Sequence, residues 1–138
     1  MKSTQMAADY AKRAERFLAE AESDLSAGDY ATCVRRTQES LELASKAVLR
    51  RLAVEYPREH DVSEAFGAVA ERLPDYLKVN RENIKTMLTE LANVRGPAFY
   101  GYEVEGVPAS QAFTREYALN TLEKVKPLVE SCVRFAVE

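Results

Sequence analysis

Apolar residues recur at every third or fourth position through most of this chain, and this spacing limits its fold more than any other feature. About residues 4–27 the apolar positions fall on one face of an α-helix, because a helix has 3.6 residues per turn. These positions are Met6, Tyr10, Ala14, Phe17, Leu18, Ala21 and Leu25. Gly28 suits the left-handed residue that follows a helix, and Asp29 suits the N-cap of the next one. The sequence therefore predicts two antiparallel helices joined by a tight turn.

The second predicted helix runs from about Tyr30 to Tyr56 and carries two apolar stripes. The main stripe is Tyr30, Cys33, Val34, Thr37, Leu41, Ala44, Val48 and Leu52, and the second is Leu43, Ala47 and Val54. A helix with two apolar faces makes contacts on two sides, either at the centre of a bundle or at a dimer seam. Pro57 ends this helix, because the residue before a proline disfavours the helical conformation.

A short third helix and a long fourth helix follow. Asp61 and Glu64 have the spacing of a capping box, which predicts a helix start within "HDVSEAF". The fourth helix begins at Asp75 or at Asn80, since both residues are good caps. It ends near Arg95, and residues 96–113 are predicted to form a loop. Loops of that length in compact domains tend to be functional or mobile.

A fifth helix completes the predicted architecture. Thr114 caps it, and its apolar stripe keeps its phase across Pro127, which predicts a bend and not a break. The sequence as a whole predicts an all-α protein, an antiparallel up-and-down bundle of four long helices and one short helix. At 138 residues the chain is predicted to be a single domain over 1–138.

Charge and cysteine content exclude several classes of protein. The net charge is −3, so binding to nucleic acid would need a local basic patch. Cys33 and Cys132 each lie within an apolar helical pattern, which indicates buried thiols and not a disulfide or metal pair. A single histidine and no C-x-x-C leave no metal site or cofactor to expect. We expect neither a signal peptide nor a membrane span, and hence a cytoplasmic protein.

Arg95 is the main candidate functional residue, because it shares the apolar face of Leu88 and Leu91 at the end of a helix. One interpretation is an arginine that favours the helix C-terminus and reaches water. The other is a semi-buried guanidinium, which needs a partner. Glu42 in the second helix is the candidate partner.

Three polar residues fall at i, i+4 and i+8 on the second helix: Gln38, Glu42 and Lys46. They form either a solvated face with a Glu–Lys pair or part of a site. His60 is interpreted as a turn or capping residue, since the sequence shows no nucleophile or orienting group for a general base. Several arginines form either a basic patch or ordinary surface charge: Arg13, Arg16, Arg35, Arg36, Arg50, Arg51 and Arg58.

Four segments resemble the HEPN family (higher eukaryotes and prokaryotes nucleotide-binding). In order along the chain they are "AERFLAEAESDLSAGDYATCVRRTQESLELASKAVL", "EHDVSEAF", "VRGPAFYGYE" and "FTREYALNTLEKVKPLVESCVRF". Within the first, Gln38, Glu42 and Lys46 stand at the polar positions of the family's Q-x-x-x-E-x-x-x-K pattern, and "HDV" resembles a helix start of the family. The resemblance covers nearly the whole chain and implies a helical bundle that pairs as a homodimer.

Many proteins of that family are metal-independent RNases, often the toxins of toxin–antitoxin pairs. Their signature is an arginine, four to six residues, and a histidine near the end of a long helix. Arg95 matches the arginine, but Tyr100 and Tyr102 stand where the histidine is expected. A phenol with a pKa near 10 is a poor base at pH 7. Tyr102 also has the offset of a tyrosine that receives AMP from a partner nucleotidyltransferase in toxin members.

The resemblance leads to one main interpretation and two alternatives. The main one is a non-catalytic homodimer that binds a nucleotide, RNA or a nucleotidyltransferase partner, as in a toxin–antitoxin module. Its expected ligand-binding residues are Gln38, Glu42, Lys46, Arg95, Tyr100 and Tyr102. The first alternative is a metal-independent RNase with a degenerate motif, for which Arg95 and Tyr100 are the catalytic candidates. The second is a dimerising interaction module without a ligand.

Overall fold

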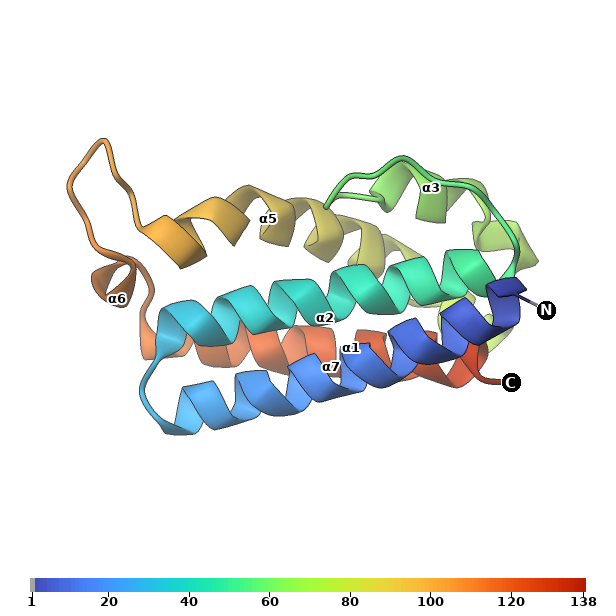
Figure 1. Cartoon of the computed structure of the whole chain (residues 1–138), viewed down its shortest axis with the longest axis horizontal. Coiled ribbons are helices and arrows are strands. Elements are labelled where there is room, and N and C mark those ends of the chain that lie inside the picture. Colours follow the sequence, from blue (N-terminus) through green and yellow to red (C-terminus); the bar gives the residue numbers. More distant parts are fainter. Residues whose placement is uncertain (1) are drawn as a thin grey trace.

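The structure, a computed structural model, describes residues 2–138 as an antiparallel bundle of four long helices (Figure 1). These helices are α1 (Lys2–Ser26), α2 (Tyr30–Arg51), α5 (Arg81–Tyr100) and α7 (Arg115–Ala136). Successive long helices run in opposite directions, and both ends of the chain lie at the same end of the bundle. The predicted all-α, up-and-down architecture is confirmed. None of the described helices has an apolar stretch long enough to cross a membrane.

Short helices are more numerous than the one predicted. They are α3 (Ser63–Ala68), a 3₁₀ turn η1 (Ala70–Arg72), α4 (Asp75–Lys78) and α6 (Ala109–Ala112). Both predicted starts of the fourth helix are used, because α4 begins at Asp75 and Asn80 is the N-cap of α5. The predicted capping box is wrong. The Asp61 carboxylate accepts from the backbone N–H of Ser63 at 2.9 Å, and Val62 occupies the N-cap of α3.

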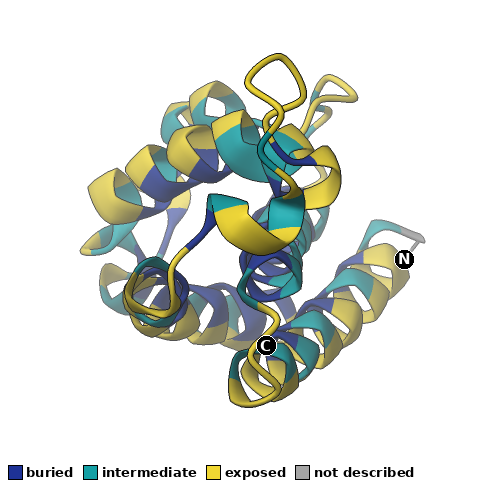
Figure 2. Cartoon of the chain, turned by 90° about the vertical axis from the view of Figure 1, so that its left-hand side faces the viewer, coloured by how far each residue is buried: buried dark blue, intermediate teal, exposed yellow. Residues whose placement is uncertain are grey.

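The central helix is α2, which packs against α1, α7 and α5. Most of its apolar positions are therefore buried within one chain, as expected for a helix at the centre of a bundle, while Leu43, Leu52 and Val54 are only partly buried. The buried residues of the bundle form one continuous core, with exposed residues on the outer faces of the helices and on the projecting loops (Figure 2). Cys33 and Cys132 are free thiols buried in this core, as predicted.

Helix α2 ends at Arg51, five residues before the predicted end. Ala53 adopts a positive φ of 57°, so the chain turns before it reaches Pro57. The N–H groups of Val54 and Ala53 bond to the carbonyls of Leu49 and Arg50, both at 3.0 Å, which is the Schellman pattern. This turn sends residues 54–61 back toward the side of α2.

Helix α5 continues to Tyr100, so the predicted loop over residues 96–113 starts too early. The helix includes Pro97 and ends at Gly101, whose φ is 77°. A Cβ on Gly101 would lie 2.2 Å from the carbonyl oxygen of Val107, so this position requires glycine. Tyr102 and Val107 then exchange two backbone hydrogen bonds that close a tight loop before α6.

The predicted caps of α2 and α7 are confirmed. The Asp29 carboxylate accepts from the N–H of Thr32 at 3.2 Å, after Gly28 with φ 79°. The Thr114 hydroxyl accepts from the N–H of Tyr117 at 3.0 Å. Helix α7 is also unbroken at Pro127, as its apolar pattern predicts.

Candidate functional site

A chain of polar contacts connects α5 to α2 and to the segment before α3. Arg95 Nε donates to Gln38 Oε1 at 3.0 Å, and Gln38 Nε2 donates to Glu42 Oε1 at 2.8 Å. Lys46 Nζ donates to Glu42 Oε2 at 2.8 Å, and His60 Nδ1 lies 3.0 Å from Glu42 Oε1. The structure thus brings four of the predicted site residues together, with Gln38 buried at their centre. Together with His60 they form a group of five residues, which we call the polar chain.

The predicted direct pair of Arg95 with Glu42 is wrong. Arg95 faces α2 one helical turn earlier, so Gln38 lies between the two charged groups. The nearest carboxylate to Arg95 is Glu39, whose Oε2 lies 3.9 Å from Arg95 Nη2. The Arg95 side chain is 24% exposed, so it is neither a fully solvated helix end nor a sealed buried charge. It remains reachable from solvent while its Nε is held in place.

Glu42 is ionised at neutral pH in spite of its burial. Burial acts to raise its pKa, but hydrogen bonds from Lys46 and Gln38 and the charges of Lys46 and His60 outweigh that effect. The pKa of Glu42 is therefore below its ordinary value. A carboxylate held this way orients the side chains around it and offsets the charge of Lys46.

His60 belongs to the polar chain, although the sequence indicates only a turn or capping residue. It reaches Glu42 because α2 ends at Arg51 and the chain folds back along it. That reversal depends on the left-handed Ala53, a conformation that no sequence rule favours for alanine. No signal in the sequence points to this contact.

Three arginines surround one carboxylate beside the polar chain. Arg36 Nη1 lies 2.6 Å from Glu39 Oε1, while Arg35 Nε and Arg95 Nη2 lie 3.6 Å and 3.9 Å from Glu39 Oε2. We call this group the arginine cluster. Glu20 of α1 lies 3.7 Å from Arg36, and the charge of Asp24 also acts on Arg36. The three guanidinium groups are therefore concentrated in one place but have several carboxylates near them.

The sequence indicates Arg35 and Arg36 only as members of a larger set of arginines that form either a basic patch or ordinary surface charge. The signal for the cluster was their spacing of four and three residues from Glu39, which places all three side chains on one face of α2. The approach of Arg95 from α5 is long-range and has no local signal. Arg35 Nη1 also donates to the carbonyl oxygen of Arg95 at 2.8 Å, which ties the two helices together.

Some donor groups of the arginine cluster make no hydrogen bond to the described part of the chain. In the described part of the chain, the terminal Nη groups of Arg95 donate no hydrogen bond, and the buried Arg35 Nε has no hydrogen-bond partner. Arg35 also lies over the ring of Phe99, 5.0 Å from its centroid. A hollow of about 250 Å³ opens beside Arg35, Arg36 and Phe99, and the carboxylate residue Asp29 also lines it. This arrangement offers charged donors next to an exposed aromatic ring.

The structure separates Tyr100 and Tyr102 from the polar chain. Because α5 stays helical through residue 100, Tyr100 lies about 140° around the helix from Arg95. Its ring meets the edge of Phe99 at 4.6 Å between centroids, and Tyr102 lies in the loop closed by Val107. Large exposed side chains gather here, and we call them the aromatic tip: Phe99, Tyr100, Tyr102 and Val104. Tyr100 is therefore not placed to act as a base beside Arg95.

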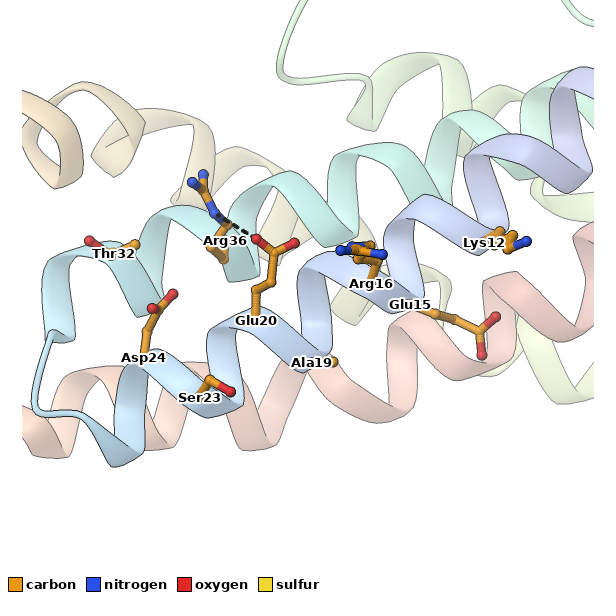
Figure 3. Close-up of a pocket in the computed structure, with 9 residues that line it drawn as sticks. All are labelled: Lys12, Glu15, Arg16, Ala19, Glu20, Ser23, Asp24, Thr32 and Arg36. Atoms are coloured by element: carbon orange, nitrogen blue, oxygen red, sulfur yellow. Dashed lines mark ion pairs between the residues drawn. The ribbon is translucent and has the colours of Figure 1, made fainter.

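A larger hollow, of about 740 Å³, lies elsewhere, on the outer side of α1 and α2 (Figure 3). Lys12, Arg16 and Arg36 line it together with three carboxylates. Those carboxylates are Glu15, Glu20 and Asp24. Because the charges balance, this surface has no preference for an anion or a cation. Over residues 2–138 no three His, Cys, Asp or Glu side chains are grouped to hold a metal ion.

The fold and the site together define a class of small helical domains. In this class an arginine near the end of one long helix, here Arg95, contacts a Gln–Glu–Lys line on another, here Gln38, Glu42 and Lys46. A comparison with protein-family models identifies that class, because the model of the HEPN domain matches residues 7–135. The chain belongs to the HEPN domain family. Searches of curated proteins and of solved structures found no match. Membership supports a function related to nucleotides or RNA in general.

Proposed function

We propose that this HEPN protein binds a nucleotide or RNA through phosphate groups at the arginine cluster, without cutting RNA. The observation that supports binding is the convergence of Arg35, Arg36 and Arg95 on the single carboxylate of Glu39. Guanidinium groups bind phosphate through charge-assisted hydrogen bonds. Neither Nη group of Arg95 donates a hydrogen bond within the described chain, although Nη2 lies 3.9 Å from Glu39 Oε2. Phe99 lies beside them with 60% of its side chain exposed, and it can stack on a base.

Binding without cleavage follows from the surroundings of Arg95. RNA cleavage without a metal needs a base for the 2′-hydroxyl proton as well as a cation for the phosphate. The neighbours of Arg95 in the described chain are Gln38, Glu39 and Arg35, and Tyr100 points to another side of α5. Loss of acid–base help costs about 10²–10⁴-fold in rate. We therefore expect wild-type cleavage to stay near background.

The test is a titration of fluorescent single-stranded RNA, ATP and AMP in EDTA, followed by anisotropy and by gel analysis of the RNA. Arg95→Gln is expected to weaken RNA binding and to lower the slope of log affinity against log salt by about 0.7 for the lost phosphate contact. Arg115→Gln, an exposed arginine at the start of α7, is the matched control. Equal binding by both variants would contradict the site, and no binding by the wild type would favour the ligand-free module.

Homodimerisation is part of the proposal, and most apolar positions of α2 are already buried by its own chain, so we place the dimer contact on another surface. The aromatic tip supports it, because Phe99 and Tyr100 are 60% and 64% exposed and Val104 is 97% exposed. Contiguous exposed apolar groups of this kind mark interaction surfaces. Sedimentation at micromolar concentration is expected to give a dimer that Val104→Lys weakens. A monomer at all concentrations would contradict the proposed homodimer.

The aromatic tip is also the surface at which we propose that a nucleotidyltransferase partner binds, as in a toxin–antitoxin module. Tyr102 is 39% exposed, so its hydroxyl is reachable by an enzyme that transfers AMP. A mass increase of one AMP on Tyr102, absent from Tyr102→Phe, after co-expression with such an enzyme would support this partner.

A second candidate function is a metal-independent RNase that uses His60 as its base. The observation that favours it is the 3.0 Å contact of His60 Nδ1 with Glu42, since a carboxylate on one ring nitrogen orients the other for proton transfer. His60→Ala distinguishes the two proposals. Metal-free cleavage by the wild type that this variant abolishes would establish the enzyme, while binding with no cleavage by either protein supports the non-catalytic function.

A further inference from the structure

A second basic site lies at the C-terminal end of α2. Lys46 and Arg50 of α2, Tyr10 of α1, and Tyr56, Arg58 and His60 of the returning segment line a hollow of about 350 Å³, which we call the basic hollow. Arg35 and Arg50 are 15 positions apart on α2, which corresponds to about 22 Å along the helix. The basic hollow is therefore distinct from the arginine cluster, although both lie along α2.

Aromatic groups hold the cation at the centre of the basic hollow. Arg50 Nε donates to the Tyr56 hydroxyl at 3.2 Å. The Arg50 guanidinium lies 5.7 Å from the ring centroid of Tyr10 and 5.5 Å from that of Tyr56. In the described chain no carboxylate forms an ion pair with Arg50 or Arg58. Because these neighbours are neutral, they do not offset the positive charge of Arg50, which can therefore attract an anionic ligand.

The charges around the basic hollow favour an anion. Glu42 neutralises Lys46 from behind, at 2.8 Å, and also holds His60. That leaves Arg50 and Arg58 facing the single carboxylate of Glu59. Glu59 forms no ion pair in the described chain, so its charge opposes an anionic ligand without being tied to either arginine. The site is open to solvent through the exposed Arg58 and His60.

We propose that the basic hollow is a second phosphate-binding site, occupied by a phosphate group of a nucleotide or of an RNA backbone. Arg50 and Arg58 bind the phosphate oxygens, and the half-buried Lys46 and the ring of His60 line the wall behind them. The chemical class of the ligand rests on the proposed function, whereas the position of the site rests only on the geometry described above. Two phosphate sites about 22 Å apart along α2 also let a single RNA strand contact both ends of the helix, which a mononucleotide cannot do.

The experiment uses His60, the only histidine of the chain, as a reporter. Its ring signals are followed by NMR while the full-length protein is titrated with pyrophosphate, with ADP and with a single-stranded oligoadenylate. We expect saturable shifts of the ring signals, and roughly three- to tenfold weaker binding in Arg58→Gln and Arg50→Gln. Arg58 is exposed, so its replacement leaves the fold intact even if Arg50→Gln does not.

Glu59→Gln supplies the opposite test, since removing the opposing charge is expected to tighten binding by roughly twofold or more, a gain that misfolding cannot produce. Arg115→Gln is the control and is expected to change nothing. His60 signals that do not shift, or shift equally in all variants, would overturn the second site. Nucleotide or RNA binding that depends on Arg95 while His60 stays silent would overturn it but leave the proposed function standing.

A saturable response to pyrophosphate without any binding of ADP or RNA would support the site and remove the proposed function. A response to oligoadenylate that is much stronger than the response to ADP would identify the source of the phosphate as an RNA strand. The reverse order would identify a mononucleotide.

Discussion

The two ends of α2 hold their arginines in different ways. At the N-terminal end, Arg35, Arg36 and Arg95 converge on the carboxylate of Glu39, at 2.6 Å to 3.9 Å. At the C-terminal end, Arg50 is held by a tyrosine hydroxyl and two aromatic rings, with no carboxylate partner in the described chain. The polar chain through Gln38 and Glu42 lies between them.

This difference shows two ways to place positive charge on a small acidic protein. Ion pairs around Glu39 organise three cations but neutralise part of their charge, and salt weakens those that are exposed. Cation–π contacts and a hydrogen bond to a neutral hydroxyl leave the charge of Arg50 uncompensated, but they position the side chain more weakly. The N-terminal end is therefore the more rigid site, and the C-terminal end depends on how the returning segment packs.

The largest expected effect comes from breaking the link between the two ends. Gln38 is 2% exposed and bonds to both Arg95 and Glu42. Gln38→Ala removes the hydrogen bonds to both partners and is expected to lower the free energy of unfolding by about 2–4 kcal/mol. Urea unfolding measures this loss. Gln111→Ala, an exposed glutamine on α6, is the control and is expected to change stability by less than about 0.5 kcal/mol.

Removing the charge at the centre has the next largest effect and depends on pH. The pKa of folded Glu42 lies below its ordinary value of 4.5, so ionised Glu42 stabilises the fold above that pH, and this stabilisation is lost as the pH falls through the folded pKa. Glu42→Gln is expected to cost about 1–3 kcal/mol at pH 7 and progressively less below about pH 4.5. Urea unfolding at several pH values checks both parts. A cost that is constant with pH would mean that the charge of Glu42 contributes nothing.

Arg95 and Arg50 allow the two ends to be compared directly. Arg95→Ala removes a hydrogen bond to a buried amide and is expected to cost about 1–2 kcal/mol. Arg50→Ala removes a hydrogen bond to a tyrosine hydroxyl and cation–π contacts near the surface and is expected to cost about 0.5–1 kcal/mol. Unfolding at low and high salt sharpens the contrast, because the contact of Arg95 with Glu39 is weakened by salt. An equal loss at both positions would contradict the difference between the ends.

The smallest expected effect is that of Tyr100→His, which we expect to give no gain in RNA cleavage. Tyr100→His restores the spacing of the family's RNase motif but is expected to leave RNA cleavage at background, because α5 places residue 100 about 140° around the helix from Arg95. Cleavage is measured without metal, with Tyr100→Phe as the matched control. Cleavage by Tyr100→His alone would show that a second protomer or a change in α5 brings the imidazole to the arginine cluster.

The sequence alone determined the fold class and most helix boundaries, because they depend on local chemistry. Periodic apolar positions specify the four long helices, while Asp29 and Thr114 cap two of them through contacts within three residues. It also placed Gln38, Glu42 and Lys46 on one line, since a helix fixes that geometry without reference to the rest of the protein. Arg95 was identified by its position on an apolar face next to a sequence that resembles the family's motif.

Two helix ends were predicted wrongly, and both errors changed the site. Ala53 adopts a left-handed conformation that alanine disfavours, so packing and not propensity ends α2 early. Pro97 and Gly96 favour a helix end, yet α5 continues past both until Gly101, where the close approach of Val107 stops it. The first difference brings His60 to Glu42, and the second carries Tyr100 away from Arg95.

The partners of the charged groups were decided only by the tertiary structure. Gln38 stands between Arg95 and Glu42, and Glu39 takes the place expected for Glu42, because the register of α5 against α2 depends on core packing along both helices. A shift of a single turn, about 5.4 Å, exchanges one carboxylate for the other. Local sequence specifies which face a side chain lies on, but the residue that it meets across the bundle follows from how all the helices pack together.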